Sequence, residues 1–127
     1  MIINMQDRLL LLLGGLFGVI GVVLASVAAH ITGPGQVDVA ANIMLFHAPA
    51  LIAIALVAHA GIGCPKAIRL SGWMVMLGVA LFSGDLCMRA FLYERLFPMA
   101  APTGGTILIL GWLLFSLMVL MGNKKQS

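Results

Sequence analysis

Two residues of opposite charge, Asp85 and Arg89, stand four positions apart inside a long apolar stretch of the sequence. Positions i and i+4 share one face of a helix, and an acid that precedes a base is the favourable order for an ion pair. Insertion scales give a cost of about 2.5 to 3.5 kcal/mol for one such charge at the centre of a membrane helix, so a partner is required. The spacing therefore predicts a buried structural ion pair between Asp85 and Arg89.

Other polar or helix-opening residues are expected near this pair, at the end of the protein that faces away from the cytoplasm. Thr103 follows Pro102 and is a natural N-cap, so the positive end of its helix dipole points outward and, with Arg89 nearby, favours an anion. Because His47 lies about one helical turn inside its span from the same side, we expect His47 and Asp85 to occupy one level. The predicted ligand-binding site consists of His30, His47, Asp85, Arg89, Thr103, Gly104 and Gly105.

Metal binding, haem binding and proton transfer are alternative uses of these residues. His30 and His47 supply two imidazoles and Asp85 an oxygen ligand, but the sequence contains no His-x3-His or Cys-x2-Cys pair. Asp85 and Cys87 point about 200° apart on a helix, so one site cannot use both. A proton relay through His47 and Asp85 lacks acidic residues in the inner half of the spans, and no nucleophile motif is present. The sequence therefore predicts no metal ligands, cofactor or catalytic residues and does not favour an enzyme.

Four apolar runs carry these residues and dominate the chain of 127 residues. The composition is 62% hydrophobic and 9% charged, with a mean hydropathy of +1.14, whereas soluble domains contain about 25% charged residues. About 20 helical residues cross a hydrocarbon core of about 30 Å. We therefore predict an all-α integral membrane bundle of four transmembrane helices, with residues 1–127 as one domain and Pro49 kinking the second helix. The predicted spans are residues 9–29, 43–62, 70–91 and 104–122.

The basic residues lie singly or in pairs beside the predicted spans, which indicates membrane anchors and not a nucleic-acid surface. By the positive-inside rule, the side with more Lys and Arg faces the cytoplasm. The opposite side has Arg89 and Arg95, whereas the side of the two termini and the second connection has Arg8, Lys66, Arg69, Lys124 and Lys125. This distribution predicts that the N-terminus and the C-terminus are both cytoplasmic.

Several short motifs together resemble the YgdD-like family. They are Ala28-Ala29-His30, Phe46-His47-Ala48, Leu81-Phe82-Ser83-Gly84-Asp85-Leu86, and Ala101-Pro102-Thr103-Gly104-Gly105 with Gly111-Trp112. This is a family of small bacterial inner-membrane proteins with a eukaryotic relative, classified as a domain of unknown function. The resemblance implies a four-helix membrane protein and brings no established activity, substrate or catalytic residues. Members often have a small hydroxyl residue where Asp85 stands, which makes its pair with Arg89 a subgroup feature. The resemblance places the family's histidine and glycine motifs on His30, His47, Ser83, Gly84, Pro102, Gly104 and Gly105.

We interpret the chain as a small, non-enzymatic accessory, assembly or lipid-interacting subunit of a bacterial inner membrane, with the outer polar layer as its contact surface. The expected partners are membrane lipids and a larger membrane complex or a second copy of the chain. One alternative is a protein that binds or transports a small solute or an anionic lipid. A second alternative is a metal- or haem-binding redox component. The sequence shows no inverted repeat of the kind that transporters use, which favours the accessory role.

Overall fold

The computed structural model describes residues 2–121, which form four long helices. α1 covers Met5–Val27 and continues directly into a short π-helical segment, η1, at Ala28–Thr32. The other helices are α2 (Gln36–Ala60), α3 (Pro65–Leu92) and α4 (Ala100–Met121). All four are long and apolar enough to cross a membrane, and the described residues contain no strand. The prediction of an all-α, four-span membrane protein is confirmed; Lys124 and Lys125, used to predict its orientation, lie outside the described residues.

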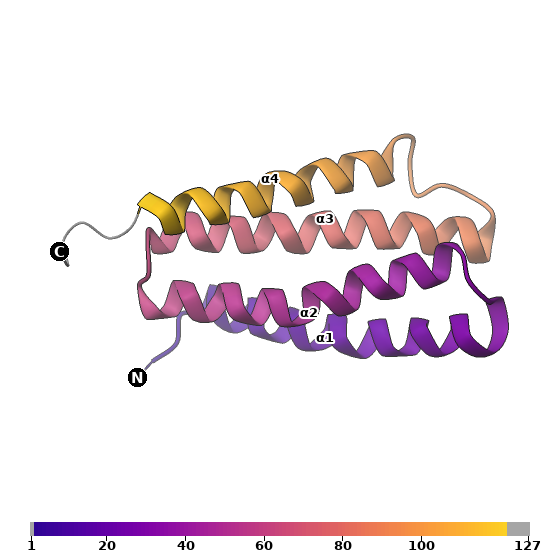
Figure 1. Cartoon of the computed structure of the whole chain (residues 1–127), viewed down its shortest axis with the longest axis horizontal. Helices are drawn as coiled ribbons and strands as arrows, with labels where there is room; N and C mark the ends of the chain where they lie inside the picture. The colour runs from indigo at the N-terminus through magenta and orange to yellow at the C-terminus, as the bar shows by residue number, and fades with distance from the viewer. Residues whose placement is uncertain (1, 122–127) are drawn as a thin grey trace.

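The ends of the molecule are set by the antiparallel order of the helices. Figure 1 shows α1 beginning and α4 ending at the same end, beside the connection between α2 and α3. We call this the inner end. The outer end consists of residues 28–35, which join α1 to α2, and residues 93–99, which join α3 to α4.

All four helices begin earlier than the predicted spans, and the two early starts at the outer end, those of α2 and α4, affect the candidate site. α2 begins at Gln36 and not at residue 43, because Asp38 in its first turn interacts favourably with the positive end of the helix dipole. α4 begins at Ala100 and not at residue 104. Pro102 is tolerated there, because a proline in the first helical turn loses no intrahelical hydrogen bond. The N–H of Thr103 therefore donates to the carbonyl of Met99 at 2.9 Å inside α4. The prediction that Thr103 is the N-cap is wrong.

The helices do not form a closed ring. α1, α2 and α3 pack around a core that includes Leu10, Leu51 and Val75, each fully buried. α4 lies along α3, as Figure 1 shows. Among the described residues, no Cα atom of α4 lies within 8 Å of one in α1 or α2. α4 is therefore held to the other helices mainly through α3.

Small residues allow α3 and α4 to approach closely. A Cβ atom added to Gly104 would lie 2.7 Å from the backbone nitrogen of Phe82 and 2.8 Å from the carbonyl oxygen of Gly78. Helices in lipid gain affinity from such close backbone packing, since lipid supplies no hydrophobic drive for association. In α2, the bend visible near the middle of the helix in Figure 1 coincides with the part that contains Pro49. This bend agrees with the expected effect of a proline that removes a helical hydrogen bond.

Candidate functional site

The carboxylate of Asp85 is fully buried and has two different partners. Its Oδ2 atom lies 3.0 Å from Nη2 of Arg89, one helical turn later in α3. Its Oδ1 atom accepts a hydrogen bond of 2.8 Å from the backbone N–H of Leu96, in the connection between α3 and α4. Asp85 therefore neutralises a membrane-embedded charge and also fixes the outer connection. The ion pair follows from the sequence spacing, whereas the bond to Leu96 does not.

His47 lies in the middle of α2 and uses both ring nitrogens. The indole N–H of Trp112 on α4 lies 3.1 Å from Nε2, and the carbonyl oxygen of Ile43 lies 2.7 Å from Nδ1. Because an indole nitrogen can only donate, Nε2 is the acceptor, and Nδ1 carries the proton that binds Ile43. The ring is 8% exposed and its centroid lies 5.8 Å from that of Trp112. His47 is therefore a neutral interhelical connector in this structure.

The structure does not bring His47 and Asp85 to one level. The hydroxyl of Ser83, two residues before Asp85, donates to the carbonyl of Ala40 at 3.5 Å, which aligns this part of α3 with the outer part of α2. On α2, His47 lies two turns farther inward than Ala40, a difference of about 10 Å along the helix. The prediction of a shared level is wrong, because the early start of α2 places His47 deep in the protein.

The remaining predicted site residues have separate environments. His30 is exposed on η1, and Thr103 is exposed in the first turn of α4. Gly104 is buried against α3, while Gly105 next to it is partly exposed. The structure therefore joins Asp85 to Arg89 but does not collect the predicted ligand-binding residues around one cavity.

A second buried ion pair, at the inner end, is missed by the sequence analysis. Asp7 in the first turn of α1 is fully buried, and Arg69 of α3 binds it through two hydrogen bonds. Nε lies 2.7 Å from Oδ1, and Nη2 lies 3.1 Å from Oδ2. This fork geometry is the strong form of an arginine–carboxylate contact. The available signal was that Asp7 is the one acidic residue of the sequence near the basic residues of this end.

An apolar hollow in the membrane-spanning part of the described chain lies between α1 and α3, with Met44 of α2 also lining it. Its volume is about 350 Å³, and we call it the α1–α3 groove. Its lining includes the exposed residues Ile20, Ala80 and Phe91, so it opens at the lateral surface of the helices, in the outer half of the protein. It is lined by Phe17, Ile20, Leu24, Met44, Ala80, Ser83, Gly84, Cys87 and Phe91.

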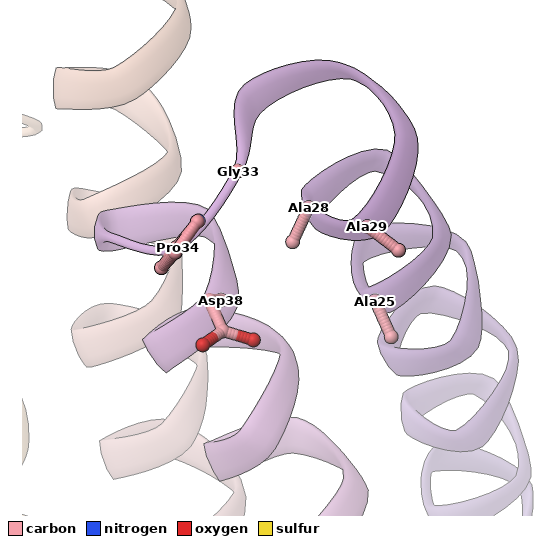
Figure 2. A pocket seen from close by; sticks show the side chains of 6 residues that line it. All are labelled: Ala25, Ala28, Ala29, Gly33, Pro34 and Asp38. Atoms are coloured by element: carbon pink, nitrogen blue, oxygen red, sulfur yellow. The ribbon is translucent and has the colours of Figure 1, made fainter.

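A smaller pocket of about 260 Å³ lies at the outer end. Figure 2 shows Asp38 of α2 turned toward Ala25, Ala28 and Ala29 across this pocket, beside Gly33 and Pro34. Asp38 is partly exposed and lies in the first turn of its helix, where a carboxylate is favoured without a ligand. Among residues 2–121 there is no group of three or more His, Cys, Asp or Glu side chains placed to hold a metal ion.

Comparison with known proteins places this arrangement in a family. Residues 24–105 match the family described as "Protein of unknown function (DUF423)", and this range is more than half of the chain. The chain belongs to the DUF423 family. The family segment of this DUF423 protein contains His47, Asp85, Arg89 and Arg69, whereas Asp7 and Trp112 lie outside it.

The DUF423 protein is similar to bacterial proteins named UPF0382 membrane proteins. The one from Staphylococcus haemolyticus is 32% identical over 75 residues, which are 59% of each chain. The one from Haemophilus influenzae is 34% identical over 77 residues, which are 61% of this chain and 60% of the relative. The matches thus span about three fifths of the length of these relatives. No solved structure matches the chain. These relatives and the four apolar helices identify a multi-pass membrane protein.

Proposed function

We propose that this DUF423 protein is a non-enzymatic, lipid-interacting module of the bacterial inner membrane, and that the α1–α3 groove holds a lipid acyl chain. The observation that carries the proposal is an apolar groove that opens sideways in a protein built from membrane-spanning helices. Hydrocarbon is the solvent around such helices, so an apolar hollow of this kind is filled by lipid or by another protein.

The size of the groove favours an acyl chain over a partner helix. With a pitch of 5.4 Å and a diameter of 10–12 Å, one helical turn with its side chains takes up roughly 400–600 Å³. The groove offers about 350 Å³, less than a single turn, so a partner helix could place only side chains in it. A narrow, flexible hydrocarbon chain fits such a space, and its contacts with Phe17 and Phe91 replace contacts with bulk lipid.

The polar residues support a non-enzymatic role, because they bind one another. Asp85 contacts Arg89 and Leu96, and His47 uses both nitrogens within the protein. The predicted alternative of a small-solute or anionic-lipid site in the outer polar layer gains no support, since its residues lie apart. The alternative of a metal- or haem-binding redox component gains none either, because the histidines do not converge.

The setting of the module in the membrane is part of the proposal. The relatives come from bacteria, which supports the bacterial inner membrane, and the resemblance to the YgdD-like family points the same way. The basic residues of the inner end support cytoplasmic termini.

Cys64 is exposed at this end, so a membrane-impermeant maleimide should label it in inverted vesicles and not in intact spheroplasts. Labelling in spheroplasts would indicate the opposite orientation, with both termini outside the cytoplasm.

Filling the groove tests the proposed function. Ala80 lines it, so Ala80→Phe should place a ring where the acyl chain lies. Ala53→Phe is the matched control, since Ala53 is also exposed in the membrane part but lies on α2 away from the groove. Native mass spectrometry in mild detergent should show one retained phospholipid fewer on Ala80→Phe than on the unmodified protein and on Ala53→Phe. Equal retention by both variants, or none by the unmodified protein, would contradict the proposal.

A further inference from the structure

A polar pocket at the inner end, on the opposite side of the membrane from the α1–α3 groove, has no role in the proposed function. It has a volume of about 390 Å³ and lies where α1 and α3 begin. Its lining contains two amide side chains and two basic ones, from Asn4, Gln6, Lys66 and Arg69. We call it the inner polar pocket.

Arg69 is held rigidly at the wall of this pocket. Two of its N–H groups bind the buried carboxylate of Asp7, and a guanidinium carries five such donors, so three remain. Its side chain is 18% exposed, so these donors lie at the pocket and not in open water. Asp7 therefore acts as a positioning residue that fixes the plane of the guanidinium before any ligand arrives.

Lys66 lies three residues before Arg69 on the same face of α3 and adds a second cation to the lining. Unlike Arg69, Lys66 is exposed. The N-termini of α1 and α3 both lie at this end, and their dipoles add to the positive potential. Two cations and two amide donors around one hollow suit an oxyanion with several acceptor oxygens.

The acidic residues are also distributed unequally between the two ends of the protein, which favours an anion site at the inner end. The inner end has one acidic residue, Asp7, whose charge is already bound by Arg69. The other acidic residues, Asp38, Asp85 and Glu94, all belong to the outer half. Free positive charge is therefore concentrated at the inner end, where the positive-inside rule expects the anionic cytoplasmic leaflet.

We propose that the inner polar pocket binds the phosphate of an anionic phospholipid headgroup, with Arg69 and Lys66 as the cationic ligands and Asn4 and Gln6 as neutral donors. Basic pockets between transmembrane helices on the cytoplasmic side are suited to such headgroups. The pocket differs from the α1–α3 groove in leaflet and chemistry, so either site can fail its test while the other passes.

The test compares phosphatidylglycerol with phosphatidylcholine as additives to the full-length protein in mild detergent. Thermal unfolding, followed by tryptophan fluorescence, should shift to a higher temperature with phosphatidylglycerol than with phosphatidylcholine. Lys66→Gln should weaken the apparent affinity for phosphatidylglycerol about fivefold, the loss expected for one cation near an anionic surface. Arg95→Gln, which removes an exposed cation at the outer end, is the matched control and should leave this affinity unchanged.

Three results would overturn the proposal. The first is equal stabilisation of the unmodified protein by both lipids, and the second is an equal loss in Lys66→Gln and Arg95→Gln. The third is stabilisation by inorganic phosphate that matches that by phosphatidylglycerol, which would replace the lipid with a free anion. Because Lys66 is exposed, its variant should fold normally, and its unfolding temperature without added lipid checks this. Ala80→Phe should keep the preference for phosphatidylglycerol, which separates this site from the groove.

Discussion

The indole N–H of Trp112 donates to Nε2 of His47 across 3.1 Å and connects α4 to α2. The backbones of these helices stay apart, since no Cα atom of α4 lies within 8 Å of α2 in the described part of the chain. Long aromatic side chains therefore bridge a gap that helix packing leaves open. The bond also completes the hydrogen bonding of a histidine that is 8% exposed in a membrane protein.

We expect this bond to stabilise the position of α4. A double-mutant cycle of His47→Leu and Trp112→Phe should give a coupling free energy of about 0.6 to 1.7 kcal/mol, the mean and the maximum measured for interhelical hydrogen bonds in a membrane protein. Unfolding in detergent and SDS mixtures measures the four free energies. A coupling of zero would mean that the hydrogen bond between the two rings contributes nothing to stability. Phe115→Leu, which alters the other ring contact of Trp112, serves as the control for lost aromatic packing.

The two members of the inner ion pair should differ in their effect on stability. Arg69→Gln leaves the fully buried Asp7 without its cation, whereas Asp7→Asn leaves a partly exposed Arg69 that can reach water or headgroups. We expect Arg69→Gln to cost about 3 to 5 kcal/mol of unfolding free energy and Asp7→Asn clearly less. The double variant should recover part of the larger loss. Equal losses from the two single variants would contradict this account.

Asp85 should fix the outer connection more strongly than Arg89 does, because Asp85 accepts the hydrogen bond from Leu96. Asp85→Ala removes both the ion pair and the acceptor of the Leu96 N–H, so amide exchange at Leu96 should accelerate strongly. Arg89→Gln leaves the Leu96 bond in place, although it unbalances a buried charge. Asp85→Asn combined with Arg89→Gln keeps an acceptor oxygen and should recover much of the stability lost by Arg89→Gln. Slow exchange at Leu96 in Asp85→Ala would disprove the role in the connection.

Two neighbouring glycines of the predicted ligand site provide a matched pair for the packing of α4. A Cβ on Gly104 would lie 2.7 Å from the backbone of Phe82, whereas the nearest atom to a Cβ on Gly105 is 3.9 Å away. Gly104→Ala should therefore force α4 away from α3 and cost about 1 to 3 kcal/mol. Gly105→Ala should be neutral or slightly stabilising, since alanine favours helix. Equal melting temperatures for the two variants would show that the helices can separate freely.

Local sequence features were enough to predict the class of the protein and one ion pair. The four spans follow from apolar composition alone, and Asp85 and Arg89 meet because i and i+4 share a helix face in any fold. Among the helix starts, that of α2 differs most from its predicted span. The polar residues Gln36 and Asp38 lie outside the apolar run of α2 but inside the helix, so the depth of His47 was misjudged.

Only the tertiary structure decided which polar residues meet across helices. Arg69 binds Asp7 across 62 positions of the chain, and Trp112 binds His47 across 65. No spacing rule links residues so far apart, because their encounter depends on which faces of the helices pack and at what height. Those choices are made by the close contacts of small residues such as Gly78 with Gly104, which hydropathy does not detect. Composition thus determined that the chain spans the membrane, and shape complementarity between helices determined where its charges and pockets lie.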